Sequence, residues 1–315
     1  MATTVSRQDY LEDYEYFMAL ALLTGQRNTD PDKQVGACIV KDNKVIAVGY
    51  SQVLDGRGDD NRHEYHAEID AIMKVADVHG CTMFVTMFPC NECVKVMIQS
   101  GIRHVVYLSE NETAENRNVK ASGKMLRKEN VCCEKYMGGK DPITLTFPNE
   151  ESTEQTVRNR TPESDYFMAV AVLTAQKSRD PSTQVGACIV RDDKVIVAVG
   201  HNQMPNNHND KYTWVRDTQA DDNKYLYVCH AELNAILSST DVRGCTIYVT
   251  LFPCSACAKL VIGAGVKKVF YLSDKYSNTP DTIASREMLE AKNIKLVSFY
   301  GRDDPQKETI EIKME

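Results

Sequence analysis

The feature that most constrains the fold of this chain is a short pattern that occurs twice at the same spacing. His66–Glu68 (His-Ala-Glu) is followed by Pro89–Cys93 (Pro-Cys-Asn-Glu-Cys), and His230–Glu232 is followed by Pro253–Cys257 (Pro-Cys-Ser-Ala-Cys). In both copies the His lies 24 positions before the first Cys of the pair. Chance could produce one such match, but two at identical spacing indicate a duplicated unit that gathers the same side chains twice.

The duplication covers most of the chain. With 315 residues, the chain is long enough for two domains that each bury a core. The repeat is domain-sized, which is typical of tandem duplication rather than of a solenoid. We expect a first domain at residues 1–140, a linker rich in Gly, Pro, Glu, Thr and Asn at residues 141–162, and a second domain at residues 163–315. Further matching segments are Tyr16–Thr24 with Tyr166–Thr174, Asp30–Val40 with Asp180–Val190, and Cys81–Thr86 with Cys245–Thr250.

Each unit is predicted to alternate helices with strands. A Leu/Ala/Met-rich helix comes first, and two β-branched runs around a charged turn then predict a hairpin. The His-Ala-Glu segment opens a helix with apolar residues at helical spacing, and Pro-Cys-x-x-Cys opens another that stops at Gly101 or Gly265. The order indicates an α/β fold of two tandem three-layer α/β/α domains, each with a mixed central sheet of about five strands. A short strand is expected at Ile143–Phe147, and the charged tail after Gly301 is expected to fray.

Composition and charge exclude several classes of protein. No run of about 18 apolar residues could span a membrane, and the first ten residues lack the apolar core of a secretory signal. The formal net charge of −7 argues against a long nucleic-acid track. The 11 cysteines are an odd number, and four of them form the Cys-x-x-Cys pairs. A reducing compartment is therefore expected, the cytoplasm or also the nucleus.

The repeated pattern predicts two zinc sites. One His and two Cys leave one coordination position open, as in catalytic zinc sites, whereas structural sites close with four protein ligands. A helix N-terminus behind Pro favours thiolates, because free amides and the helix dipole stabilise negative charge there. The Glu two residues after each His could face the open position and act as a proton shuttle. We therefore expect about two Zn²⁺ per chain. The predicted ligands are His66, Cys90 and Cys93 in the first copy and His230, Cys254 and Cys257 in the second, with Glu68 and Glu232 as the shuttles.

The His-x-Glu…Pro-Cys-x-x-Cys pattern is the signature of the zinc nucleobase deaminases, and both copies resemble that family. The second copy closely resembles the deoxycytidylate (dCMP) deaminases over nearly all of residues 164–300. This resemblance rests on the segments Gly200–Asn207, Trp214–Arg216, Tyr225–Ile236, Phe252–Cys254 and Leu272–Tyr276. It implies a cytidine-deaminase-like fold in each unit.

The resemblance also implies a reaction and its regulation. The expected reaction is hydrolysis of dCMP to dUMP and ammonia, which would supply dUMP for thymidylate synthesis. In that family the loop Asn, here Asn202, contacts the nucleotide, and we add Arg216 and Tyr276 as further candidate contacts. Activation by dCTP and inhibition by dTTP at a separate site are expected, with Mg²⁺ accompanying the triphosphate. A homo-oligomer is expected as well.

The first copy departs from this pattern. In Gly49–Leu54, Ser51 replaces the loop Asn and Leu54 replaces the Pro. From Ser51 to His66 there are 15 steps, against 28 from Asn202 to His230, so 13 residues are missing. Ser is shorter than Asn and is expected not to reach the same atoms, and one lost substrate hydrogen bond costs about 1–3 kcal/mol. We expect the first site to keep its zinc, with a degenerate nucleotide loop.

Two other functions remain open from the sequence. One is a two-domain polynucleotide cytidine deaminase, which also pairs an inactive with an active unit; the acidic charge and the dCMP-type loop argue against it. The other is a regulatory pseudoenzyme that binds nucleotide without converting it; the intact second zinc pattern argues against that. The sequence leaves open mono- or triphosphate substrate, turnover at the first site, effector identity and oligomer number.

Overall fold

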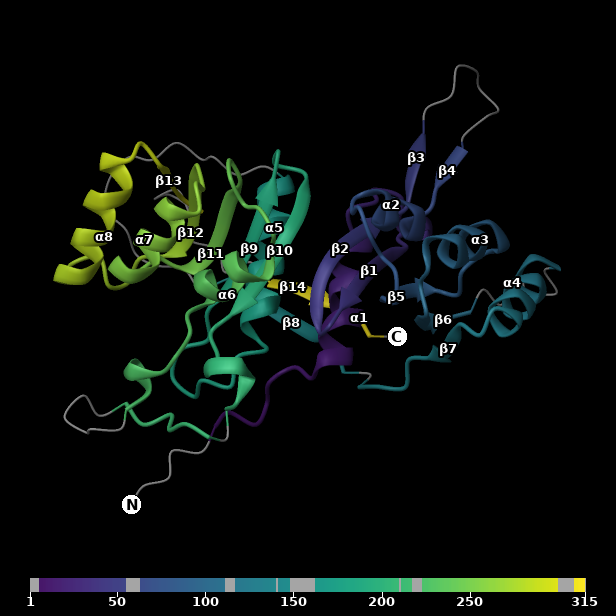
Figure 1. The fold of residues 1–315 in the computed structure, drawn as a ribbon, viewed down its shortest axis with the longest axis horizontal. Helices are drawn as coiled ribbons and strands as arrows, with labels where there is room; N and C mark the ends of the chain where they lie inside the picture. Colours follow the sequence, from purple (N-terminus) through teal and green to yellow (C-terminus); the bar gives the residue numbers. More distant parts are fainter. Residues whose placement is uncertain are drawn as a thin grey trace. The chain divides into compact units, whose positions relative to one another are not determined.

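The structure is a computed structural model that describes residues 6–54, 63–110, 117–139, 141–147, 162–209, 211–216, 223–299 and 309–314 (Figure 1). The chain divides into two compact units. The first unit comprises Asp13–Thr144 with Glu311–Glu315, and the second comprises Leu145–Ile310 with Met1–Glu12. The division between Thr144 and Leu145 falls inside the segment that the sequence predicts as a linker. Unlike the predicted boundaries, the N-terminal segment groups with the second unit and the C-terminal segment with the first.

The first unit holds a five-stranded mixed sheet in the order β2-β1-β5-β6-β7. Strand β1 runs antiparallel to both β2 and β5, while β5, β6 and β7 run parallel to one another. A short hairpin of β3 and β4 lies outside this sheet. The elements are α1 (Asp13–Gly25), the 3₁₀ turn η1 (Pro31–Lys33), β1 (Gly36–Lys41), β2 (Lys44–Tyr50), β3 (Gln52–Leu54), β4 (His63–Tyr65), α2 (Ala67–Met73), β5 (Thr82–Met87), α3 (Asn91–Ser100), β6 (His104–Ser109), α4 (Arg117–Lys128) and β7 (Cys132–Lys135).

The second unit repeats this topology with the sheet order β10-β9-β11-β12-β13. Its strand directions match those of the first unit. The elements are α5 (Pro162–Ala175), β9 (Gly186–Arg191), β10 (Val195–His201), the 3₁₀ turns η2 (Pro205–Asn207) and η3 (Lys224–Leu226), α6 (Ala231–Ser238), β11 (Thr246–Leu251), α7 (Ser255–Gly263), β12 (Lys268–Ser273), α8 (Pro280–Ala291) and β13 (Lys295–Ser298).

Each sheet separates two helical layers, because alternate residues of a strand point to opposite faces. On one face, Phe17 of α1 meets Phe84 of β5 with ring centroids 5.2 Å apart. On the other, the flanking residues Met83 and Val85 join a core cluster with residues of α2, α3 and α4. The second unit places α5 on one face, and α6, α7 and α8 on the other. The prediction of two three-layer α/β/α domains with mixed five-stranded sheets is confirmed.

Two local features place the metal-binding helices. The predicted hairpin turns are tight, with positive φ at Asp42 (50°) and Asn43 (61°), and the second unit repeats them at Asp192 and Asp193. Helix α6 lies very close to β10, because a Cβ on Gly200 would come within 2.4 Å of the backbone nitrogen of Ala235. This approach seats the helix that begins with the metal-binding His directly on the sheet.

The chain ends differ from the sequence-based expectation. The predicted fraying of the tail is wrong for residues 309–314, because β14 (Thr309–Ile312) pairs with β8 (Ile143–Thr146), and Ile312 and Met314 are buried. Gly301 lies outside the described residues. Near the other end, the backbone nitrogens of Arg7 and Leu11 donate to Arg179 and Gln176 of the second unit, at 3.0 and 3.1 Å. Among the described residues, no helix is long and apolar enough to cross a membrane.

Candidate metal centres and substrate pocket

The predicted ligands of the second unit come together at the N-termini of two helices. His230 is the N-cap of α6 and Cys254 is the N-cap of α7. The Nδ1 atom of His230 lies 3.5 Å from Sγ of Cys254 and 3.4 Å from Sγ of Cys257. The backbone N–H of Cys257 also points at the Cys254 sulfur, at 3.5 Å. All three donor atoms lie within 4.8 Å of one another, so the structure brings together the full predicted set.

The first unit repeats this cluster. His66 caps α2 and Cys90 caps α3. Nδ1 of His66 lies 3.2 Å from Sγ of Cys93 and 3.5 Å from Sγ of Cys90. These three donors also lie within 4.8 Å of one another. The two clusters therefore have the same composition, the same supporting elements and nearly the same spacing.

The chemistry and spacing of both clusters fit zinc. With Zn–S bonds of about 2.3 Å and Zn–N bonds of about 2.0 Å, tetrahedral geometry separates neighbouring donor atoms by about 3.5–3.8 Å. The N–S distances of 3.2–3.5 Å are close to that range. One imidazole nitrogen and two sulfurs suit a borderline-soft ion such as Zn²⁺ better than Mg²⁺ or Ca²⁺.

Electrostatics within the clusters also favour a cation. The hydrogen bond from Cys257 lowers the pKa of Cys254 to about 4, against an opposing effect of burial. The corresponding bond from Cys93 lowers the pKa of Cys90 to about 3. The partner thiols, Cys257 and Cys93, have raised pKa values because each donates to its neighbour. The arrangement within each pair therefore favours one thiolate, and a bound cation would favour loss of the second proton.

The two predicted proton shuttles lie beside these clusters. Glu232 and Glu68 are each 3% exposed, in the first turns of α6 and α2. Burial raises the pKa of both carboxyl groups, which brings them closer to the neutral range in which a general acid–base group works. Each carboxyl also reaches the second Cys of its own cluster. Both carboxyl groups therefore lie against their own clusters, and their role as proton shuttles stays a prediction.

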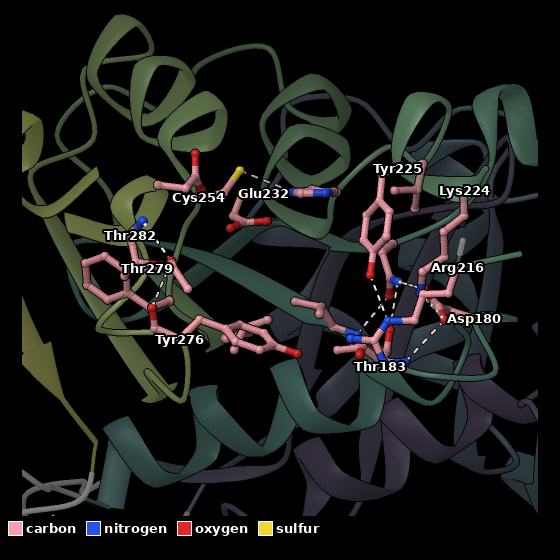
Figure 2. Close-up of a pocket in the computed structure, with 17 residues that line it drawn as sticks. Asp180, Thr183, Arg216, Lys224, Tyr225, Glu232, Cys254, Tyr276, Thr279 and Thr282 are labelled. Carbon is pink, nitrogen blue, oxygen red and sulfur yellow. Dashed lines mark hydrogen bonds and ion pairs between the residues drawn. The ribbon is translucent and has the colours of Figure 1, made fainter. Parts of the chain in front are cut away.

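A pocket of about 310 Å³ opens onto the metal cluster of the second unit (Figure 2). Figure 2 shows Cys254 and Glu232 close together, with Arg216, Lys224 and Tyr225 on the side of the pocket away from them. His230 lines the pocket beside Cys254. All three predicted substrate contacts line it. Its lining residues are Asp180, Thr183, Val185, Asn202, Arg216, Lys224, Tyr225, Val228, His230, Glu232, Leu251, Phe252, Cys254, Tyr276, Thr279, Asp281 and Thr282.

The end of the pocket away from the metal cluster contains a buried ion pair and an exposed guanidinium. Nζ of Lys224 lies 2.8 and 2.7 Å from the two carboxylate oxygens of Asp180, and both side chains are almost completely buried. The positive charge of Lys224 and the negative charge of Asp180 therefore offset each other within the pocket wall. Nε of Arg216 donates to the hydroxyl of Tyr225 at 2.8 Å, and this Arg side chain is exposed. Arg216 therefore contributes positive charge that the ion pair does not offset.

Comparison with known proteins identifies the family. The family described as "Cytidine and deoxycytidylate deaminase zinc-binding region" matches residues 11–109 and 161–273, which together are most of the chain. The chain belongs to this family. It is accordingly a zinc-dependent hydrolytic deaminase, and both matched regions contain the start of the metal site and its Cys pair.

Individual relatives agree with this assignment. Human deoxycytidylate deaminase is 50% identical over 142 residues, which are 44% of this chain and 80% of the human protein. The probable deoxycytidylate deaminase of Drosophila melanogaster is 46% identical over 157 residues, 47% of this chain and 75% of the fly protein. A structure of dCMP deaminase from the cyanophage S-TIM5 in complex with dCMP and dUMP is 26% identical, covers 44% of this chain and 99% of the phage chain, and has a TM-score of 0.36.

In the second deaminase unit, Asn202 stabilises the backbone that forms part of the pocket wall. Its Oδ1 accepts from the backbone N–H of Val185 at 2.8 Å, and its Nδ2 donates to the carbonyl of Thr183 at 2.9 Å and to Asp180 at 3.3 Å. The hydroxyl of Ser178 donates to the Asn202 carbonyl at 3.0 Å. Asn202 therefore fixes the Asp180–Val185 segment of the wall; its predicted contact with a nucleotide stays a prediction.

The first deaminase unit keeps this arrangement with the two residue types exchanged. Ser51 stands in the place of Asn202, and Asn28 stands in the place of Ser178. The Ser51 hydroxyl accepts from the backbone N–H of Val35 at 3.2 Å and donates to the carbonyl of Lys33. Nδ2 of Asn28 in turn donates to the Ser51 carbonyl at 2.9 Å. The Ser51 hydroxyl therefore holds the equivalent loop backbone, and Asn28 bonds the Ser51 carbonyl. The expectation that Ser51 does not reach the nucleotide atoms stays a prediction.

Several residues that line the pocket were not predicted from the sequence as site residues. Lys224 and Tyr225 belong to the longer segment that only the second unit carries, and Asp180 opens the repeated Asp-Pro pair. The length difference before His230 was therefore the available signal for Lys224. Thr279, Asp281 and Thr282 surround the start of α8, and no motif marked them. Trp214, in the same longer segment, is 2% exposed and packs as a core residue.

Proposed function

We propose that the second unit hydrolyses dCMP to dUMP and ammonia, which would supply dUMP for thymidylate synthesis. The observation that carries this proposal is the pocket that joins a complete His/Cys/Cys cluster with a buried Glu232 at one end to Arg216 at the other. A deoxycytidine monophosphate has matching ends, an amino-substituted ring and an anionic phosphate. The relatives named deoxycytidylate deaminase support the same substrate.

Glu232 is the proposed proton carrier. When bound, zinc in a three-ligand site supplies Lewis-acid activation of the attacking water. The water adds at C4 of the cytosine ring and the C4–N4 bond breaks, so that the amino group leaves as ammonia. Glu232 takes a proton from the water and delivers protons to the ring nitrogen and to the departing amine. Burial raises the pKa of its carboxyl group above the ordinary value, which favours its holding a proton that it can then deliver.

The rest of the pocket orients the nucleotide in this proposal. Arg216 keeps guanidinium N–H groups beyond its bond to Tyr225, and such groups bind phosphate oxygens in a bidentate manner. Lys224 is already paired with Asp180 and so shapes the wall rather than the charge. Figure 2 shows Tyr276 projecting into the space between the two ends, where its ring could contact the sugar or base.

A substrate panel tests the proposal. Purified protein is offered dCMP, CMP, deoxycytidine, dCTP and a cytosine-containing single-stranded oligonucleotide, and ammonia release is measured for each. We expect dCMP to give the highest kcat/KM. Turnover confined to the oligonucleotide would instead identify a polynucleotide deaminase. Nucleotide binding with no turnover of any substrate would identify a regulatory pseudoenzyme.

We also propose that both clusters hold zinc and that the chain is regulated and self-associates. Two complete ligand sets support about two Zn²⁺ per chain. Regulation by dCTP and dTTP, with Mg²⁺ accompanying the triphosphate, and a homo-oligomer rest on the resemblance to dCMP deaminases. Light scattering that gives a monomer under active conditions would contradict the proposed oligomer.

A further inference from the structure

Arg286, in the second turn of α8, lies outside the pocket but contacts two segments that form its wall. Its guanidinium carbon lies 4.5 Å from the ring centroid of Phe252 and 5.8 Å from that of Tyr271. Its Nη2 donates to a carboxylate oxygen of Asp274 at 3.2 Å. Phe252 lines the pocket and directly precedes the Pro253–Cys254 pair of the metal site. One side chain therefore connects the metal-binding segment with the end of β12.

Asp274 is the first residue of the connection that carries Tyr276 to the pocket. The connection is a series of turns: the N–H of Ser277 donates to the Asp274 carbonyl at 2.7 Å, and that of Thr279 donates to the Tyr276 carbonyl at 2.9 Å. The Thr279 hydroxyl then caps α8. Tyr276 itself is 41% exposed, so core packing contributes little to its position. The bond from Arg286 to Asp274 therefore helps to fix the positions of Tyr276 and Thr279.

The first unit shows what this region looks like without an Arg at the position of Arg286. Alignment of α4 with α8 places Gly123 where the second unit has Arg286. The three partners of the guanidinium are retained, in the pairs Phe88 with Phe252, Tyr107 with Tyr271, and Glu110 with Asp274. The aromatic pairs even keep their geometry, with ring centroids 4.9 and 5.0 Å apart and planes near 90°.

A cavity of about 490 Å³ lies at this place in the first unit. It is lined by Phe88, Tyr107, Glu110 and Gly123, together with residues of α4 and β7. A Cβ on Gly123 would meet only the Arg127 guanidinium, at ordinary contact distance, so the site is open. The aromatic and carboxylate partners are thus present in both units, but the helix position that carries Arg286 in the second unit carries Gly123 in the first. In the first unit Arg127, one turn further along α4, lines the cavity.

We infer that Arg286 is a positioning residue for the substrate pocket, holding Phe252 and the Asp274–Thr279 connection at the distance that the nucleotide requires. It acts through these neighbours and does not touch the substrate. The contact of the Arg286 cation with the Phe252 ring and the partly exposed ion pair of Arg286 with Asp274 each stabilise this region modestly. The inference rests on the proposed function, because its main readout is the KM for dCMP.

The test replaces Arg286 with the residue of the first unit. In Arg286→Gly, we expect KM for dCMP to rise about tenfold, which corresponds to about 1.4 kcal/mol, while kcat and the zinc content stay near those of the wild type. Arg286→Lys keeps the charge but not the planar fork and should fall between the two. Millimolar methylguanidinium should lower the KM of Arg286→Gly but not of the wild type, because it can occupy the vacated site.

The matched control is Gly123→Arg, the reverse exchange in the first unit, which should leave dCMP kinetics unchanged. An unchanged KM in Arg286→Gly, or a loss of zinc or of folded protein with KM unchanged, would overturn the inference. If Arg286→Gly does not fold, Asp274→Asn breaks the same ion pair and should raise KM in the same direction.

A second readout does not depend on activity. The backbone amides of Ser277 and Thr279 should exchange hydrogen faster in Arg286→Gly than in the wild type, while those of β12 stay protected. A wild-type protein that does not deaminate dCMP would refute the proposed function. Equal exchange at Ser277 and Thr279 in both proteins would refute the anchoring role by itself.

Discussion

The buried pair of Lys224 and Asp180 offers a sharp test of the second unit. We predict that Lys224→Met strongly destabilises that unit. The two side chains are 4% and 3% exposed, and their closest N–O distance is 2.7 Å. Removal of the ammonium leaves a carboxylate that is only 3% exposed without its counter-charge, and breaking a buried pair in this way costs about 3–5 kcal/mol. The remaining donors to Asp180, which include the Ser182 amide at 2.8 Å, do not replace a full charge.

The first unit offers a control with the same closest N–O distance and different burial. Lys95 and Glu92 also lie 2.7 Å apart, but their side chains are 54% and 66% exposed. An exposed pair contributes about 0–1 kcal/mol, so Lys95→Met should be nearly neutral. The contrast between the two variants reports mainly burial, because each pair joins a Lys to a carboxylate at the same closest distance.

The assay is reversible urea unfolding of the zinc-loaded protein, followed by thermal unfolding. For a unit of this size, Lys224→Met should lower the midpoint of the second unit by about 10 °C. The double variant Lys224→Met/Asp180→Asn removes the stranded charge and should recover about 2 kcal/mol relative to the sum of the single changes. If Lys224→Met costs no more than Lys95→Met, Asp180 is not a buried carboxylate that needs Lys224, and the reasoning is wrong.

Three further predictions concern the metal sites and regulation. Metal analysis should give about two zinc ions per chain, falling to about one in Cys90→Ala and in Cys254→Ala; one zinc in the wild type, unaffected by Cys90→Ala, would contradict this. Glu232→Ala should lower kcat for dCMP by at least about 10²–10⁴-fold, whereas Glu68→Ala should retain most activity; equal losses would mean that the first site also reacts. Saturation by dCMP should shift from sigmoidal toward hyperbolic with dCTP, and dTTP should oppose this, each through a coupling of about 1–3 kcal/mol; hyperbolic kinetics that neither nucleotide alters would count against regulation.

The features that the sequence predicted well are those that depend on neighbouring residues. The turns at Asp42–Asn43 and Asp192–Asp193 adopt positive φ, as short polar residues between β-branched runs suggest. The predicted His and Cys side chains also lie together in each unit, because the repeated 24-residue spacing carries a helix and a strand of fixed order between His and Cys.

The features that the sequence did not predict depend on pairs of residues far apart in the chain. Lys224 and Asp180 are 44 positions apart, and neither residue type alone predicts a buried ion pair. Strand β14 was expected to fray because its composition is charged, yet its pairing with β8 decides its structure. Long-range pairing overrides local composition in both cases, and a single sequence does not reveal the partner.

The exchange of Ser and Asn between the two units has a consequence for how such a chain can change over time. The pair is Asn28 with Ser51 in one unit and Ser178 with Asn202 in the other, and each pair holds the same loop backbone. A single substitution converts either pair into two Asn or two Ser, which crowds the loop or leaves backbone groups without a partner. The two positions are therefore epistatic: neither can be exchanged freely while the other stays. Ser51 considered alone suggests a lost hydrogen bond to the loop backbone. Considered together, Asn28 and Ser51 show that the loop backbone keeps its hydrogen bonds.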